Sequence, residues 1–159
     1  MDIKIKTDEE NFKFRVNSLI INDNKALLVD INNNGFLCLP GGHVQIGEDT
    51  KEAVVRETME EVGVTSKTQK LFAVIENFFK NKKGKSFHEL SFYYLMENAS
   101  VPKEKQHDYV FVENDDGKLM NLDFKWVPLD KVDEYNIKPD FLKEILKEGK
   151  FDFKHHVVK

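Results

Sequence analysis

Three glutamates close together in the sequence could act jointly on a charged ligand. Glu57, Glu60 and Glu61 are spaced as i, i+3 and i+4, so a helix would present all three on one face. Like charges at this spacing destabilise a helix by about 0.2–0.5 kcal/mol per pair. The cluster is therefore either a solvated acidic surface or a site for a hard cation such as Mg²⁺, which takes carboxylate, carbonyl and phosphate oxygens as ligands.

The residues that precede the glutamates favour the cation site. Residues 40–42 read Pro-Gly-Gly, which predicts a loop rather than a strand. An exposed glycine turn beside an acidic helix can add a carbonyl oxygen to the carboxylates. In the helix itself, Asp49 is the expected N-cap, Glu52 would complete a capping box, and Gly63 is expected to end the helix.

The other face of this helix is the one expected to be buried. Winding the helix at about 100° per residue places the following side chains on that face: Val55, Thr58, Met59 and Val62. Arg56 could offset only one of the glutamate charges, most simply that of Glu60 at i+4.

The segment 42–64 as a whole resembles the Nudix box, in which Gly, Glu and Arg-Glu-U-x-Glu-Glu-x-Gly-U follow one another at fixed spacing, U being a bulky aliphatic residue. Every fixed position matches in identity and spacing: Gly42, Glu48, Arg56, Glu57, Glu60, Glu61, Gly63 and Val64. Thr58 departs from the aliphatic preference, although its methyl group can still pack. Residues 126–129, Trp-Val-Pro-Leu, are also similar to a segment that precedes the C-terminal helix in Nudix (MutT-like) hydrolases.

This resemblance implies a fold and an activity. The fold is α+β, a Nudix-type α/β/α sandwich with a mixed β-sheet, formed by residues 1–159 as a single domain with a C-terminal helix at about 139–149. The activity is Mg²⁺-dependent hydrolysis of a phosphoanhydride bond in a nucleoside diphosphate linked to another moiety, with Mn²⁺ as a substitute. The alternative is a non-catalytic nucleotide-binding module that acts as a sensor, but a sensor has no need of the full acidic cluster.

The resemblance also implies roles for residues of the box. Metal ligands are expected at Glu57, Glu61, Glu60 and, through its carbonyl oxygen, Gly42. Glu60 could instead be the general base, and Arg56 is expected to orient it. Glu48 would brace the loop against the helix or hold a water molecule.

Contacts to the rest of the substrate are expected outside the box, among aromatic residues and in the segment 98–120. The candidates are Phe78, Phe87, Tyr93 and Tyr109. Glu89, in the middle of an expected strand, is either an additional acid at the site or a solvent-facing residue. His43 could contact a phosphate or point to solvent. Damaged triphosphates, ADP-ribose, sugar nucleotides, dinucleoside polyphosphates and RNA 5′ ends all remain open as substrates.

The expected strands surround the box. They cover residues 12–21, 25–30, 36–39, 70–79, 87–97 and 109–113. The C-terminal helix should bury Phe141, Leu142, Ile145 and Leu146. The tail 150–159, which contains the pair His155-His156, is expected to be frayed.

Composition narrows the compartment and the partners. Acidic residues outnumber basic ones by 28 to 24, which argues against nucleic acid as a partner and leaves a small-molecule nucleotide, with a homodimer as an open alternative. The single cysteine, Cys38, excludes an internal disulfide, suits a reducing cytoplasm and is expected to be a small core residue. No apolar run approaches the roughly 18 residues of a membrane span.

Overall fold

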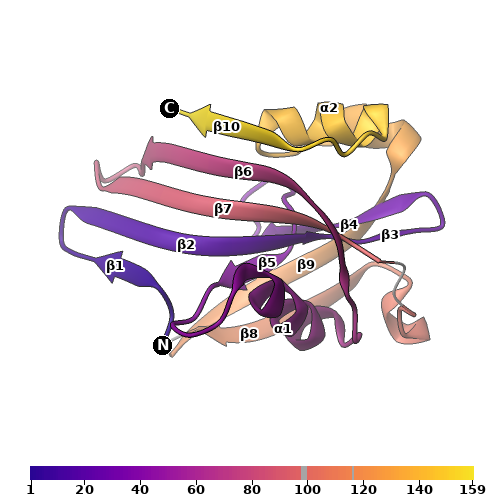
Figure 1. The fold of residues 1–159 in the computed structure, drawn as a ribbon, viewed down its shortest axis with the longest axis horizontal. Coiled ribbons are helices and arrows are strands. Elements are labelled where there is room, and N and C mark those ends of the chain that lie inside the picture. Colours follow the sequence, from indigo (N-terminus) through magenta and orange to yellow (C-terminus); the bar gives the residue numbers. More distant parts are fainter. Residues whose placement is uncertain (98–99, 116) are drawn as a thin grey trace.

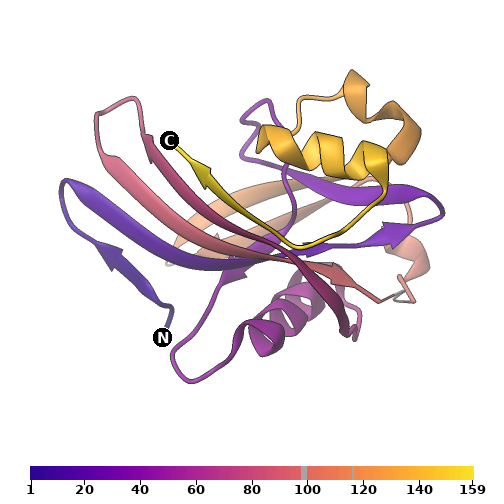
Figure 2. The same cartoon turned by 45° about the horizontal axis from the view of Figure 1, so that its top comes forward.

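The computed structural model describes residues 1–97, 100–115 and 117–159, and this part of the chain forms two β-sheets and two α-helices (Figure 1). The larger sheet has the strand order β1-β2-β7-β6-β10, with β5 paired to β2. Its strands are β1 (Lys4–Lys6), β2 (Glu10–Leu19), β5 (Gly41–His43), β6 (Thr68–Lys80), β7 (Ser86–Met96) and β10 (Lys154–Val158). The β6–β7 hairpin and the β1–β2 turn extend beyond both helices (Figure 2).

This larger sheet is mixed. Strand β2 runs parallel to β7 and β6 runs parallel to β10, whereas β6 and β7 pair as an antiparallel hairpin. The smaller sheet is antiparallel throughout, in the order β3-β4-β9-β8. Its strands are β3 (Ile21–Asn22), β4 (Lys25–Ile31), β8 (Tyr109–Asp115) and β9 (Lys118–Pro128). The mixed sheet is as predicted, and the division into two sheets is a feature that the sequence did not reveal.

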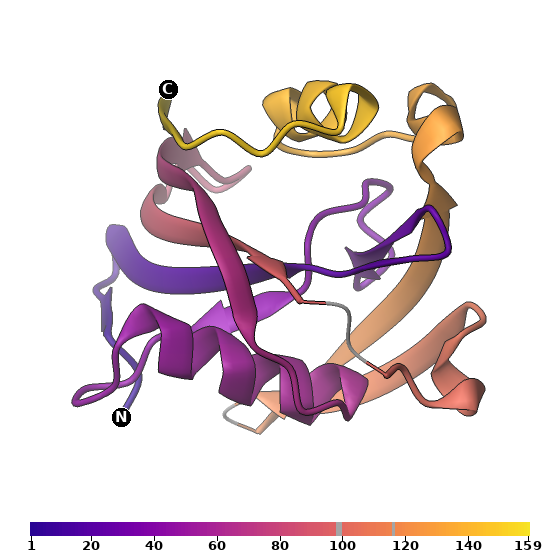
Figure 3. The ribbon, with the colours of Figure 1, turned by 45° about the vertical axis from the view of Figure 1, so that its right-hand side comes forward.

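The two helices lie on opposite sides of the strands. Helix α1 (Thr50–Val62) covers one side and α2 (Asp140–Glu148) the other, so the predicted α/β/α sandwich is confirmed (Figures 1 and 3). Short 3₁₀ helices, η1 (Lys103–Lys105) and η2 (Leu129–Glu134), connect the strands of the smaller sheet to the rest of the chain.

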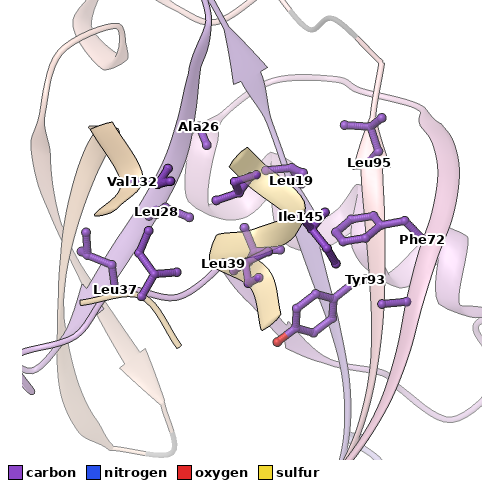
Figure 4. Packing of buried hydrophobic residues seen from close by; sticks show 14 of the residues in the cluster. Leu19, Ala26, Leu28, Leu37, Leu39, Phe72, Tyr93, Leu95, Val132 and Ile145 are labelled. Carbon is purple, nitrogen blue, oxygen red and sulfur yellow. The ribbon is translucent and has the colours of Figure 1, made fainter. Parts of the chain in front are cut away.

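A hydrophobic core lies under each helix. Beneath α2, apolar side chains from the larger sheet, from β4 and from residues 37–39 pack against one face of the helix (Figure 4). That face is formed by Leu142, Ile145 and Leu146, and Gly149 ends the helix in the left-handed region at φ 66°. Beneath α1, a second cluster includes Val16, Val54 and Phe124.

The segment before α1 differs from its prediction. Residues 36–39 are not a strand, since they form only isolated bridges, Val29 to Cys38 and Leu37 to Ile137. In the expected loop at residues 40–42, Gly41 and Gly42 instead begin β5, which pairs with β2. Glycine makes this pairing possible, because a Cβ atom at Gly41 would lie 2.0 Å from the backbone oxygen of Val16.

The tail is also different from its prediction. Residues 154–158 form β10, which pairs in parallel with residues 73–77 of β6 and covers the free edge of that strand. The histidine pair is held in place by this strand. His155 Nε2 lies 2.7 Å from a carboxylate oxygen of Glu76, and the ring of His156 stacks on Phe141 with a centroid distance of 4.0 Å.

Neither helix in the described part of the chain is long and apolar enough to cross a membrane.

Candidate active site

Helix α1 begins and ends as its sequence predicted. The Asp49 side chain accepts hydrogen bonds from the backbone amides of Lys51 and Glu52, and the Glu52 carboxylate accepts one from the Asp49 amide at 2.9 Å. This reciprocal pair is a capping box. At the other end, Gly63 adopts φ 76° and closes the helix with backbone bonds to residues 58 and 59.

The face of α1 that the helix buries matches the predicted one only in part. Met59 is 42% exposed, whereas Glu57 and Glu61 are only 8% and 4% exposed. Thr58 and Val62 are buried as expected. The Thr58 hydroxyl donates to the Val54 carbonyl oxygen at 2.7 Å, so this polar group is satisfied within the helix. Two carboxylates therefore point into the protein rather than to solvent.

These carboxylates enter a cavity of about 210 Å³ between α1, β5, β2 and β8, which we call the acidic pocket. Figure 3 shows α1 and the β8–β9 hairpin on the same side of the molecule. Gly42 forms part of the wall, and a Cβ atom there would lie 2.1 Å from the carboxylate carbon of Glu57. The Nudix-box glycine is therefore required because the Glu57 carboxylate occupies the space of a side chain.

Three carboxylates converge in this pocket. Ligand oxygens of Glu57, Glu61 and Glu113 all lie within 4.8 Å of one another, and we call these residues the acidic trio. Sequence reasoning missed Glu113, because residues 109–112 are all apolar or aromatic and show no alternation that would indicate which way it points. In the structure the odd-numbered residues Tyr109, Phe111 and Glu113 are partly buried, while Val110 and Val112 are exposed. The alternation thus directs Glu113 inward.

The electrostatics of the trio are unfavourable without a counter-charge. Burial raises the pKa of Glu61 well above its usual value, and the charges of Glu57 and Glu113 raise it further. Burial also raises the pKa of Glu57, against the lowering effect of Arg56. The pKa of Glu113 is raised by burial and then by Asp115. An all-oxygen donor set with this excess of negative charge fits a hard divalent cation.

Arg56 connects the loop to the helix. Its guanidinium binds both Glu48 oxygens, at 2.6 and 3.1 Å, and donates to Glu57 at 2.7 Å and to the His43 carbonyl at 3.0 Å. Arg56 also pairs with Glu60 as predicted, at 3.5 Å, but it binds Glu48 and Glu57 more closely, so the expectation that it offsets only one glutamate is wrong. Glu48 also accepts a bond from the Gln45 amide at 2.7 Å, which fastens the loop to the helix.

Comparison with known proteins decides the family. The NUDIX domain matches residues 12–148, most of the chain. This chain belongs to the Nudix family. The solved structure of a MutT protein from Bacillus halodurans is similar over 92% of this chain and 90% of that one, with a TM-score of 0.60 and 20% identity. At that identity the likeness concerns the fold.

Two relatives share part of the sequence. An ADP-ribose pyrophosphatase from Methanocaldococcus jannaschii is 38% identical over 85 residues, which are 52% of this chain and 48% of that protein. An 8-oxo-dGTP diphosphatase from Escherichia coli is 35% identical over 69 residues, 40% of this chain and 54% of that protein. In both cases the match spans about half the length of the relative.

Within the Nudix box, Glu60 differs from its two neighbours. It lines the acidic pocket, but its side chain is 54% exposed and, among the residues the structure describes, it stands outside the group of three that could hold an ion. Glu60 therefore lies at the pocket rim, where a side chain can meet both solvent and a ligand.

His43 and Cys38 are both neutral groups. Burial, followed by the charge of Arg15, lowers the pKa of His43 to about 4, so its imidazole is uncharged at neutral pH. Its side chain lines the acidic pocket rather than pointing freely to solvent. Burial raises the pKa of the Cys38 thiol to about 11, as suits a core residue.

Two of the residues proposed as substrate contacts lie around another cavity. Glu89 is 3.7 Å from Lys13 and, like Tyr93, lines a cavity of about 520 Å³ formed by β2, β6 and β7 with residues 36–39 and 138–140. We call this the second cavity. Tyr93 is 7% exposed, and its ring packs in the core beneath α2 (Figure 4).

Of the other aromatic candidates, Phe78 and Phe87 both line a further cavity of about 650 Å³ at the β6–β7 hairpin, whereas Tyr109 does not. Phe78 stacks on His88 and Phe87 stacks on Phe79, with centroid distances of 4.3 and 4.8 Å. These two stacks lie on opposite faces of the larger sheet, because consecutive residues of a strand alternate. Tyr109 stacks on an aromatic ring of β9. In the segment 98–120, residues 98, 99 and 116 lie outside the described part, and Glu113 and Asp115 line the acidic pocket.

Proposed function

We propose that this protein hydrolyses a phosphoanhydride bond in a nucleoside diphosphate linked to another moiety, with Mg²⁺ as cofactor and Mn²⁺ as a substitute. One observation carries the proposal: two buried carboxylates and a partly buried third meet in a pocket whose glycine wall leaves room for Glu57. A sensor has no use for so unfavourable a cluster, which favours catalysis over the non-catalytic alternative. The names of the two relatives, a pyrophosphatase and a diphosphatase acting on nucleotides, support the same class of substrate.

The acidic trio would hold the cation, with the Gly42 carbonyl as a further donor. When bound, the cation would neutralise the pyrophosphate charge and lower the pKa of an attacking water. Glu57 and Glu61 project from one helix and Glu113 from a separate strand, so the ligand set also ties α1 to the smaller sheet.

The remaining residues of the box position these groups and move a proton. Arg56 holds the Glu57 carboxylate in place by its bond at 2.7 Å, and Glu48 fixes Arg56 in turn. Glu60, at the rim of the pocket, is the candidate proton acceptor, since it is the glutamate of the box that is accessible to water. In-line attack at phosphorus requires mainly such positioning.

The test is a panel of nucleotides with Mg²⁺, read by release of phosphate or nucleoside monophosphate. The panel should contain ADP-ribose, a UDP-sugar, a dinucleoside polyphosphate, and dGTP with its 8-oxo derivative. Glu61→Gln is the informative variant, and Glu144→Gln, on the exposed face of α2, is the matched control. We expect turnover of at least one substrate by the wild type and the control, and its loss in Glu61→Gln. Equal activity of all three proteins would refute the proposal.

A further inference from the structure

Arg15 occupies an unusual position near the middle of β2. It is half-buried, and its side chain lines both the acidic pocket and the second cavity. Within residues 1–97, 100–115 and 117–159 its guanidinium forms no hydrogen bond, ion pair or ring contact, although its backbone pairs with β5 and β7. The Nudix box does not include it, and sequence reasoning did not single it out.

An unpartnered guanidinium in a half-buried position calls for an explanation. Arginine carries five N–H donors and no acceptor, and a partly desolvated charge without a partner is unfavourable. The other arginine of the site shows the contrast, since Arg56 is bound by Glu48, Glu57 and a backbone carbonyl. Arg15 lines the same pocket, and none of its side-chain donors has a hydrogen-bond partner in the described part of the chain.

Arg15 also marks the connection between two cavities of different character. The acidic pocket and the second cavity have Arg15, Ile31 and Leu39 in common. The walls of the second cavity combine aromatic rings, including Phe79, and amide groups such as Asn77 with charged residues of both signs, a mixture that suits the ring and the hydrogen-bonding groups of a sugar or a base. A ligand that extends from the trio into this cavity must pass Arg15.

We propose that Arg15 binds a phosphate group of the substrate at the junction of the two cavities, with the adjoining nucleoside or sugar moiety in the second cavity. Guanidinium and phosphate match in charge and in geometry, because two parallel N–H groups can donate to two phosphate oxygens. The inference rests on the proposed function, since it assigns one wall of the same site. It explains why the acidic pocket contains a guanidinium whose charge acts on Glu61 and Glu113 from a distance but which, in the described part of the chain, is not ion-paired with either.

The chain offers a matched control for this residue. Lys13 lies two residues earlier on β2, so its side chain points to the same face of the sheet and carries the same charge. It is paired with Glu89 and lies over the ring of Phe87, and it lines neither of the two cavities. Comparing Arg15→Gln with Lys13→Gln therefore separates a specific phosphate contact from the loss of one positive charge.

The measurement is steady-state kinetics with Mg²⁺ and the best substrate from the nucleotide panel. A hydrogen-bonded charge contact is worth roughly 10- to 100-fold in binding. We expect Arg15→Gln to lower kcat/KM by about that factor, mainly through KM, because the contact exists before and during the reaction. Arg15→Lys keeps the charge but loses the two parallel N–H donors of the guanidinium, so its kcat/KM should lie between those of the wild type and Arg15→Gln. Lys13→Gln should stay within about threefold of the wild type.

Thermal unfolding of the same variants distinguishes binding from structure. Removing a charge that has no partner should leave the melting temperature of Arg15→Gln unchanged or higher, whereas removing a structural arginine would lower it. If Arg15→Gln does not fold, Arg15→Lys decides the question through KM alone.

Four outcomes contradict the inference or the function beneath it. A kcat/KM for Arg15→Gln equal to that of Lys13→Gln overturns the inference, as does a lower melting temperature with unchanged kinetics. A wild-type protein that hydrolyses none of the nucleotides refutes the proposed function itself. An active wild type with an equally active Arg15→Gln refutes only the role of Arg15.

Discussion

Helices α1 and α2 cover opposite sides of the strands and end in the same way, yet they bury different kinds of side chain. Helix α2 buries Leu142, Ile145 and Leu146, a regular apolar stripe. Helix α1 buries Glu57 and Glu61 and leaves an apolar residue, Met59, 42% exposed.

The difference indicates that α2 is built for packing and α1 for binding. An apolar stripe stabilises the native state by roughly 25 cal/mol for each Å² that it buries. Buried carboxylates with raised pKa values oppose folding until a cation joins them. Changes in the two helices should therefore separate activity from stability, and the predictions below test that separation.

Removing divalent cations should have the largest effect. In excess EDTA we expect no detectable turnover, because Arg56 offsets only part of the charge of the acidic trio, and Mg²⁺ should restore turnover. Mg²⁺ with nucleotide should also raise the melting temperature, since a ligand that binds only the native state stabilises it. Robust turnover in EDTA would show that catalysis does not depend on a cation bound by the carboxylates of α1.

The second-largest effect should be a difference in kcat between the Gln variant of Glu60 and the Gln variants of its neighbours Glu57 and Glu61. Loss of a general base costs on the order of 10²–10⁴-fold in rate. Glu60→Gln should therefore lose kcat at every Mg²⁺ concentration, whereas Glu57→Gln and Glu61→Gln should recover partly at high Mg²⁺. The measurement is a Mg²⁺ titration of kcat for all three variants. Equal rescue of Glu60→Gln would make it a ligand like the others.

A substitution in the stripe of α2 should show the opposite behaviour. Leu142 is fully buried, and Leu142→Ala should reduce the free energy of unfolding by about 2–5 kcal/mol through lost burial and a cavity. Its kcat per folded molecule should not change. Glu61→Gln should leave the unfolding free energy of the metal-free protein unchanged or higher. Denaturant titration of both variants tests the contrast, which fails if Glu61→Gln is the less stable of the two.

The smallest expected effect concerns the first turn of each helix. Asp49 caps α1 with its side chain, whereas Pro139 makes no side-chain bond at the start of α2. Asp49→Ala should reduce the free energy of unfolding by about 0.5–2 kcal/mol. Asp140→Ala, in the exposed first turn of α2, should stay within about 0.5 kcal/mol of the wild type. A larger loss of stability in Asp140→Ala would contradict the conclusion that α1, and not α2, depends on a side-chain cap.

Local signals in the sequence predicted the local features well. The caps at Asp49 and Gly63 depend on neighbouring residues, and both were confirmed. The fold class followed from the resemblance and was confirmed as well. The buried face of α1 was only partly predicted. Helical periodicity assigns apolar side chains to the buried face and glutamates to the exposed face, and it takes no account of a polar cavity.

Features that depend on distant segments could not be predicted. Glu113 and Arg15 reach the pocket only because β8 and β2 are brought beside α1 by the topology of two sheets. The strand at Gly41–His43 needed the close approach of β2, and β10 needed the open edge of β6. The assigned roles of Glu48, Arg56, Glu57, Glu60 and Glu61 stay predictions until the variants are measured.

The pairing of β10 with β6 has a consequence for folding of the chain while it is being synthesised on the ribosome. About 70 residues separate the end of β6 from the start of β10, and at roughly 5–20 residues per second their synthesis takes several seconds. Throughout that interval the growing polypeptide carries an uncovered strand edge next to a hydrophobic surface, a template for pairing with another chain. The nascent chain must therefore be protected from pairing with other chains, or complete its fold late, until β10 has been synthesised.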